Sequence, residues 1–307
     1  MEALLTVSAL VAAGLLAWAI PRWRLHRALA RPLPQEALDT LARNVEQYGG
    51  MDAAQRTRLE RLVRRFLHEK TFVGCAGLEI TDEMRVTIAG QACLLLLGTR
   101  GELVYPTLHS VLVYPGAFLV PRRQVDDAGV VSEERQDLLG ESWGDGRVIL
   151  SWDHVRRVGA EDPGHNVVLH EFAHQLDSES GSTNGAPYLG SQASYRSWSQ
   201  VLSRDFAALR ADVMLRQHSV LDHYGATSPA EFFAVATETF FEKPWQMAER
   251  HPALFAEFEK YYRVDPREWQ DPPYVVGNEA GNEAEDDAAV GAAPAAWEGG
   301  VHYGSWR

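Results

Sequence analysis

The chain has 307 residues, of which 46% are hydrophobic and 23% are charged, and its formal net charge is −13. This length and composition are those of an ordinary globular protein with one large domain or two small ones. The negative charge argues against a nucleic-acid-binding surface, which needs clustered lysines and arginines, so we expect no nucleic-acid partner.

An uncharged run over residues 3–20 lies near the start of the chain and is long enough to cross a bilayer as a helix. Four arginines follow it within residues 22–31, whereas the residue before it is Glu2. A cleaved signal peptide would carry its positive charge before the run, so this order favours a membrane anchor over residues 1–27. By the positive-inside rule, the anchor places the rest of the chain on the cytoplasmic side of the inner membrane. A purely cytoplasmic protein is the alternative.

Helical periodicity and capping signals dominate the first half of the chain. Residues 28–50 are interpreted as a proline-containing linker and a first helix. Asp52 is placed to cap a helix over residues 51–70, whose apolar residues recur at helical spacing. Residues 81–98 predict a second, mostly buried helix. Two apolar, β-branched runs bounded by glycine and proline predict strands over 109–120 and 146–152.

The second half of the chain is also expected to be mainly helical. A helix begins near Asn166, and a glycine- and serine-rich loop over 178–190 follows it. Further helices are predicted over 194–216, from Ser228 as N-cap and Pro229 to Pro244, and over 252–262. Residues 277–307 are acidic and contain almost no large apolar side chain, so we expect a disordered tail. The folded domain is therefore expected to span residues 51–276.

Residues 166–177, "NVVLHEFAHQLD", contain a His-Glu-x-x-His motif. Four residues make a little more than one helical turn, so His170 and His174 point the same way and can share one metal ion. Glu171 is rotated by about 100° from His170, which places its carboxylate beside the metal's open position as a general base. The motif also arises by chance. A solvated histidine pair fits poorly in so apolar a helix, however, and we interpret it as a zinc site.

The motif supplies two protein ligands, and the third decides the type of site. The class with a third histidine six residues after the second is excluded, because Ser180 occupies that position. Asp177 lies on the same helix face and can either bind the metal or hold the outer nitrogen of a histidine. Glu231 and Glu238, on a later helix, are the remaining candidates, and only one of them can be the ligand.

Two segments, "VVLHEFAHQLD" (167–177) and "YGATSPAEFFAVATETFFEKP" (224–244), together resemble the Mlc titration factor A family of zinc peptidases. More distantly, they resemble the catalytic domain of anthrax lethal factor. The similarity extends upstream through "RRFLHEKTFVG", "VLVYPGAFLV" and "GESWGDGRVILSW" and covers about residues 50–265. Many folds share the His-Glu-x-x-His motif, whereas the later Tyr-x6-Glu-Phe-Phe pattern is specific.

The resemblance implies a zincin-like fold of the gluzincin type, with one Zn²⁺ per chain bound by His170, His174 and Glu231. It makes Glu171 the general base and Tyr224 the donor of a hydrogen bond to the developing oxyanion. A tyrosine that caps a loop is the alternative for Tyr224. Peptides or proteins are implied as substrates, with aminopeptidase-type activity, and a sugar-responsive transcriptional repressor is implied as a partner.

We therefore expect a mainly helical α+β domain with a small mixed sheet packed on the motif helix, preceded by one transmembrane helix. Residues 146–152 are a candidate edge strand for a substrate backbone. The first functional hypothesis is a zinc metallopeptidase; the second is a regulatory binding module that keeps zinc for folding and has little turnover. Three ligands and a base favour the enzyme, because structural zinc sites are closed by four protein ligands.

Overall fold

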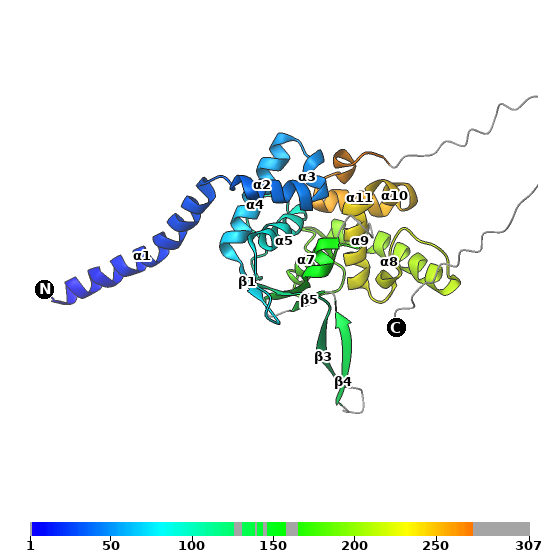
Figure 1. The fold of residues 1–307 in the computed structure, drawn as a ribbon, viewed down its shortest axis with the longest axis horizontal. Helices are drawn as coiled ribbons and strands as arrows, with labels where there is room; N and C mark the ends of the chain where they lie inside the picture. The colour runs from blue at the N-terminus through cyan, green and yellow to red at the C-terminus, as the bar shows by residue number, and fades with distance from the viewer. Residues whose placement is uncertain (1, 126–130, 139, 144–145, 158–164, 273–307) are drawn as a thin grey trace, which may run out of the picture. The chain divides into compact units, whose positions relative to one another are not determined.

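A computed structural model describes the backbone of residues 2–125, 131–138, 140–143, 146–157 and 165–272. Side chains are described for these residues except 118–143 and several positions of the first helix. The predicted acidic tail, 277–307, lies outside the described residues. Within them the chain is mainly helical with a four-stranded sheet and a separate two-stranded one, as expected for the predicted α+β class (Figure 1).

The sheet has four strands in the order β1-β2-β6-β5. β1 (Thr71–Gly74), β2 (Ser110–Tyr114) and β6 (Arg147–Ser151) run parallel, and β5 (Gly140–Trp143) pairs antiparallel with β6. The sheet is therefore mixed, as predicted. β6 is almost entirely buried and is rich in β-branched and apolar residues, which suits an interior strand covered on both faces. β3 (Phe118–Val125) and β4 (Val131–Leu138) form a separate antiparallel hairpin.

The prediction that residues 146–152 form an edge strand is wrong. β6 pairs with β2 on one side and with β5 on the other, so β5 is the edge of the sheet next to the motif helix. The sequence of β6 indicates a strand, but which neighbours it pairs with depends on the order in which the chain returns to the sheet.

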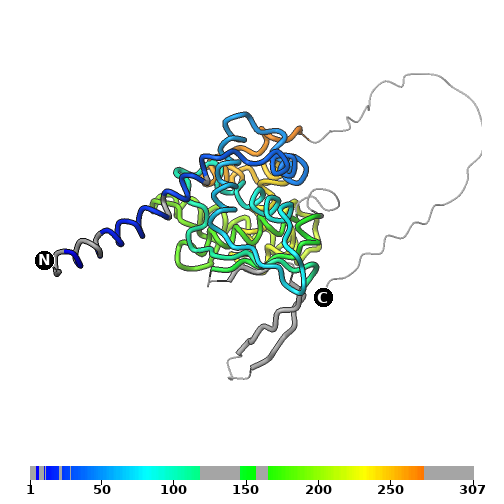
Figure 2. The backbone as a smooth tube through the Cα atoms, turned by 60° about the vertical axis from the view of Figure 1, so that its left-hand side comes forward, coloured from blue at the N-terminus to red at the C-terminus, as the bar shows by residue number. Residues whose placement is uncertain are grey.

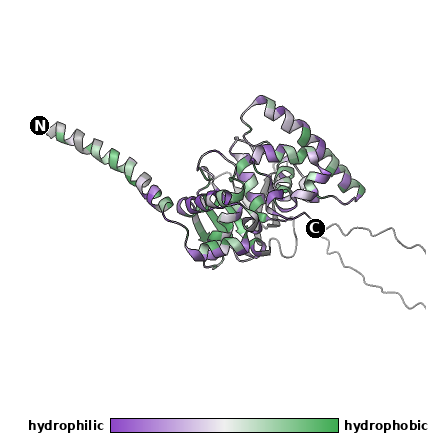
Figure 3. Cartoon of the chain, turned by 90° about the horizontal axis from the view of Figure 1, so that it is seen from above, coloured by the Kyte–Doolittle hydropathy of each residue, from purple (hydrophilic) through white to green (hydrophobic). Residues whose placement is uncertain are grey.

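The helices pack mainly on one another. Their bounds are α1 (Glu2–Ala30), α2 (Gln35–Asn44), α3 (Glu46–Gly50), α4 (Ala53–Glu69), α5 (Asp82–Leu94), α6 (Trp152–Arg157), α7 (Val167–Ser178), α8 (Gln192–Leu215), α9 (Pro229–Glu242), α10 (Pro244–Arg250) and α11 (Pro252–Tyr262). Two short 3₁₀ helices are η1 (His223–Ala226) and η2 (Pro266–Trp269). Apolar residues gather in the middle of the domain, and several also lie exposed along α1 (Figure 3).

Local signals in the sequence explain where several helices begin. The carboxylate of Asp52 accepts a hydrogen bond from the Gln55 amide, and the Gln55 side chain accepts one from the Asp52 amide. This reciprocal pair is a capping box, and it starts α4 where the sequence predicts. α9 begins at Pro229 with Ser228 as its N-cap, and Pro244 follows its end, also as predicted.

Helix α3 lies beside η2, near the end of the described chain (Figure 2). Gln47, in α3, donates a hydrogen bond to the carbonyl of Phe241 over 3.2 Å. The indole of Trp269, in η2, donates one to Gln55 over 2.9 Å. Residues 35–50, predicted as a linker and a first helix, thus contribute α2 and α3 to the domain core.

The predicted membrane-spanning helix over residues 3–20 is not supported. α1 is helical, but it does not stop where the apolar run ends; it continues through Pro21 into the arginine-rich segment and ends at Ala30. Within the residues whose side chains are described, no helix is both long and apolar enough to cross a membrane. Part of the predicted span lies outside those residues. The inner-membrane location that depends on this helix loses its support with it.

Candidate metal centre

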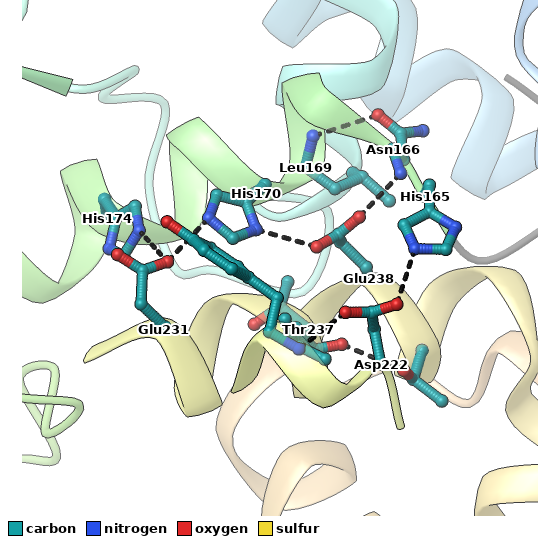
Figure 4. Close-up of polar contacts among 12 residues, drawn as sticks. His165, Asn166, Leu169, His170, His174, Asp222, Glu231, Thr237 and Glu238 are labelled. Carbon is teal, nitrogen blue, oxygen red and sulfur yellow. Dashed lines mark hydrogen bonds and ion pairs between the residues drawn. The ribbon is translucent and has the colours of Figure 1, made fainter. Parts of the chain in front are cut away.

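The motif helix α7 is held at its start by its own N-cap. The side-chain oxygen of Asn166 accepts hydrogen bonds from the amides of Val168 and Leu169, at 3.1 and 3.0 Å. One face of α7 is buried: the ring of Phe172 lies 4.7 Å from that of Tyr105 between centroids. Because this face packs in the core, His170 and His174 are directed away from it, toward α9 (Figure 4).

Helix α9 brings Glu231 to the two histidines. Ser228 caps α9 by accepting a hydrogen bond from the Glu231 amide over 3.2 Å, which places Glu231 in the first helical turn. A carboxylate at this position interacts favourably with the positive end of the helix dipole. The N-cap serine and the proline after it therefore place this side chain at the start of α9.

Three side chains converge on one point at this junction (Figure 4). Oε2 of Glu231 lies 2.9 Å from Nε2 of His170 and 3.3 Å from Nε2 of His174. The potential ligand atoms of the three residues all lie within 4.8 Å of one another. Neither Asp177 nor Glu238 belongs to this cluster.

The three residues fit a metal ion by the chemistry and spacing of their donor atoms. Two imidazole nitrogens and one carboxylate oxygen are the donor set of many zinc sites with an open position. At the usual bond lengths of about 2.0–2.1 Å, ligand atoms of a tetrahedral zinc ion are separated by about 3.3 Å. The separations at Glu231 are close to this value, so an ion can be accommodated without large movements.

Glu238 holds the outer nitrogen of His170. Its Oε1 lies 2.7 Å from Nδ1 of His170, and its Oε2 accepts a hydrogen bond from the Asn166 amide over 2.6 Å. With a metal ion bound, a proton kept on Nδ1 by Glu238 would leave the lone pair of Nε2 for the ion. Glu238 is only 5% exposed, so this arrangement is well shielded from water. The structure thus separates the two glutamates that the sequence left as alternatives.

A second carboxyl, that of Glu242, extends this network by one turn of α9. It accepts a hydrogen bond from the side-chain amide of Asn166 over 2.9 Å. Burial raises the pKa of Glu242 to about 7, despite the opposing effect of the hydrogen bond from Asn166. Asn166 therefore binds α7 to α9 through two different glutamates, Glu238 and Glu242.

The histidines and glutamates of the centre shift one another's pKa values. Burial by itself would lower the pKa of His170, but its hydrogen bonds with Glu231 and Glu238, together with the charge of Glu171, raise it well above its ordinary value. Burial by itself would raise the pKa of Glu231, but its hydrogen bonds with His170 and His174 lower it far below its ordinary value. Glu231 is thus held as an anion, which is the form that binds a cation.

Glu171 lies on α7 next to His170 and is 5% exposed. It is not one of the three clustered residues, although its charge is close enough to influence the pKa of His170. The role of Glu171 as a base beside the metal's open position stays a prediction.

Asp177 has a different role from both of those considered in the sequence. It is fully buried, and its two oxygens accept hydrogen bonds from the amides of Gly185 and Ala186, at 2.6 and 3.0 Å. Gly185 has a φ of +78°, and a Cβ there would lie 2.3 Å from the carbonyl oxygen of Pro229. Asp177 thus ties the loop after α7 to the first turn of α9, the turn that carries Glu231.

Tyr224 lies beside the centre. Its ring centroid is 6.0 Å from that of His170, and its side chain is 49% exposed. Asp222 caps η1 by accepting a hydrogen bond from the Tyr224 amide over 2.6 Å. Nε2 of His165 lies 2.8 Å from the other oxygen of Asp222.

The sequence predicted the three clustered residues together with Glu171 and Tyr224. It did not predict four residues that support them: His165, Asn166 as a bridge to α9, Asp222 and Glu242. A signal was present for two of them. Asparagine directly before an apolar helix, and aspartate two residues before a turn residue, are both common capping patterns. The contacts with α9 and with the motif helix could not be found in this way, because they join residues far apart in the chain.

Comparison with known proteins agrees with the geometry. The sequence profile of a family described as "Glucose-regulated metallo-peptidase M90" matches residues 20–263. An uncharacterized protein of Synechocystis is 40% identical over 254 residues, which is 81% of this chain and 92% of that protein. Mlc titration factor A of Cronobacter sakazakii is 34% identical over 244 residues, covering 78% of this chain and 89% of that one. The Klebsiella pneumoniae protein of the same name is 34% identical over 219 residues, 70% and 82% of the two chains. The expected aminopeptidase-type activity finds no support in the names of these three relatives.

Proposed function

Because the chain belongs to the M90 family of glucose-regulated metallo-peptidases, we propose that it is a zinc-dependent peptidase with His170, His174 and Glu231 as metal ligands. The expected similarity to the Mlc titration factor A family is confirmed by the same comparisons. The observation that carries the proposal is the convergence of the three ligand atoms within 4.8 Å. In this proposal the fold is a zincin-like one of the gluzincin type, since the third ligand is a glutamate from a later helix.

In this proposal, each residue around the ligands has its own role in the reaction. When bound, the zinc ion supplies Lewis acidity and makes water a nucleophile at neutral pH. Glu171 takes the proton from the attacking water and passes it to the leaving amine, as a general base and then a general acid. Tyr224 donates a hydrogen bond to the substrate oxygen on which negative charge develops. Glu238 keeps the ring of His170 in one orientation throughout.

We place the substrate backbone along β5. Among the described strands, β5 pairs only with β6, and it lies beside α7 (Figure 1). An extended peptide can add to such an edge through main-chain hydrogen bonds, which suits substrates that differ in side chains.

A direct test is hydrolysis of a fluorogenic peptide library by the full chain, with and without 1,10-phenanthroline. The chelator should abolish cleavage, and added Zn²⁺ should restore it. Glu171→Gln should keep its zinc and lose cleavage by about 10²–10⁴-fold. If cleavage persists in both the chelated protein and the zinc-loaded Glu171→Gln variant, the peptidase assignment is wrong.

The names of the relatives favour a second candidate, a regulatory function in which the chain binds a transcriptional repressor. It corresponds to a zinc-containing binding module with little turnover. Titration calorimetry with a purified Mlc repressor separates the two functions, because Glu171→Gln should abolish hydrolysis and leave repressor binding unchanged.

A further inference from the structure

His165 and Asp222 form a contact that joins the start of the motif helix to the turn that carries Tyr224 (Figure 4). Nε2 of His165 lies 2.8 Å from Oδ2 of Asp222, although the two residues are 57 positions apart. His165 directly precedes Asn166, the N-cap of α7. The hydrogen bond with His165 lowers the pKa of Asp222 below its ordinary value, so this carboxyl is ionised at neutral pH.

The same carboxylate holds the turn by its second oxygen. Oδ1 of Asp222 accepts the hydrogen bond from the Tyr224 amide, and the carbonyl of Asp222 accepts one from the Gly225 amide over 3.1 Å. Thr227 closes the turn by donating to the Tyr224 carbonyl over 2.8 Å. One side chain thus fixes both the shape of η1 and its attachment to the start of α7.

The position of the Tyr224 ring depends on its backbone more than that of a core aromatic does. Its side chain is 49% exposed, whereas the aromatic side chains of the core are buried on all sides. A Cβ at Gly225, the next residue, would lie 3.2 Å from side-chain atoms of Leu209 and Val235, so the turn packs closely at this position.

We propose that His165 and Asp222 act as a positioning pair, which sets Tyr224 at the distance from the metal ligands that the reaction requires. The inference depends on the proposed peptidase function and on the role of Tyr224 in it. In this proposal both residues act through Tyr224, so both are positioning residues. A displacement of about 1 Å in a catalytic group can lower the rate by about 10²-fold. Exposed ion pairs of this kind, by contrast, contribute little to global stability.

The first test is a double-mutant cycle on peptide hydrolysis by the full, zinc-loaded chain. Asp222→Ala and His165→Ala should each lower kcat by about 10- to 100-fold and change KM little. In a Tyr224→Phe background, neither substitution should lower kcat by more than about twofold, because the group that they position is already gone. Asp222→Asn should restore part of the rate, since its amide oxygen can still accept from the Tyr224 amide. If the loss of kcat caused by Tyr224→Phe and the loss caused by Asp222→Ala or His165→Ala multiply in the double mutant, the pair acts independently of Tyr224 and the proposal is overturned.

A matched control is Asp265→Ala. Asp265 caps η2 by accepting from the Arg267 amide over 3.0 Å, just as Asp222 caps η1, but it lies outside the metal centre. It should leave kcat unchanged. All of these variants should keep stoichiometric zinc, and the Asp222 and His165 substitutions should lower the melting temperature by less than about 4 °C.

A second measurement does not depend on activity. The protein is labelled with 3-fluorotyrosine, and the ¹⁹F resonance of Tyr224 is assigned by its loss in Tyr224→Phe. Asp222→Ala and the milder His165→Gln should shift or broaden this resonance, and Asp265→Ala should not. An unchanged Tyr224 resonance in both variants would refute the positioning pair even if the wild-type chain hydrolyses peptides. If the variants change the Tyr224 resonance but the wild-type chain cleaves no peptide, the peptidase assignment is refuted and the positioning pair is not.

Discussion

Oε1 of Glu238 lies 2.7 Å from Nδ1 of His170, while Nε2 of the same ring faces Glu231 at 2.9 Å. The imidazole is therefore held between two carboxylates, one from the middle of α9 and one from its first turn. This pair of contacts assigns different roles to two glutamates that are seven residues apart on one helix.

Glu238→Gln tests the supporting role. The substitution keeps the size of the side chain but replaces the anionic acceptor by a neutral one, so the ring of His170 is oriented less well. We expect zinc affinity to fall by about 10–100-fold, with the metal still bound at saturation. Competition with the chromophoric chelator 4-(2-pyridylazo)resorcinol measures the affinity, and Glu259→Gln on the exposed face of α11 is the control. An unchanged affinity would mean that Glu238 does not support the ligand.

Glu231→Gln and Glu171→Gln separate a ligand from a base. A neutral amide is a far poorer partner for a divalent cation, so Glu231→Gln should lose most of its zinc. Glu171→Gln should retain stoichiometric zinc and still lose hydrolysis by about 10²–10⁴-fold. Plasma emission spectrometry and hydrolysis assays on the same preparations give both quantities. Stoichiometric zinc in Glu231→Gln would exclude it as the third ligand.

Asp177→Ala tests the link between the loop after α7 and the first turn of α9. It removes the acceptor of the buried Gly185 amide, whereas the Ala186 amide can still donate to the side chain of Asn184. One unsatisfied buried donor costs about 1–3 kcal/mol. We expect a loss of this size in the free energy of unfolding, measured by urea denaturation of the zinc-loaded protein.

Asp177→Asn is the matched variant for this test. It keeps one acceptor oxygen and should lose less stability than Asp177→Ala. Because Asp177 lies outside the ligand cluster, both variants should bind zinc stoichiometrically once folded. Loss of zinc from well-folded Asp177→Asn would contradict this assignment.

Glu242→Gln should change how stability depends on pH. Burial raises the pKa of Glu242 from its ordinary value of 4.5 to about 7, so the folded chain keeps this proton at pH values where the unfolded chain has lost it. Stability therefore decreases as pH rises from about 4.5 to about 7 and then levels off. Glutamine does not titrate, so the variant should gain about 1–3 kcal/mol over wild type between pH 4.5 and pH 8.

Urea unfolding of both proteins at pH 4.5, 6 and 8 measures this difference. Glu249→Gln, on an exposed part of α10, should follow the wild-type curve at each pH. A difference between Glu242→Gln and wild type that is the same at all three pH values would contradict a raised pKa at Glu242.

Much of the helical framework was predictable because its causes are local. Asp52, Asn166 and Ser228 are capping residues within three positions of the amides that they accept from, and α4, α7 and α9 begin beside them. The shared direction of His170 and His174 follows from four-residue spacing on one helix. The mainly helical character of the domain was predictable for the same reason, whereas the mixed character of the small sheet depends on pairing between distant strands.

By itself, then, the sequence determined the helix starts and the histidine pair, since these depend on residues within one or two turns of each other. The tertiary structure decided which glutamate faces both histidines, what Asp177 and Glu238 hold, and that β6 is an interior strand. It also showed that α1 continues beyond its apolar run to Ala30. These features depend on which segments meet in the folded chain. Two carboxylates seven residues apart on one helix are nearly equivalent in the sequence, and only the packing of α9 against α7 makes them different.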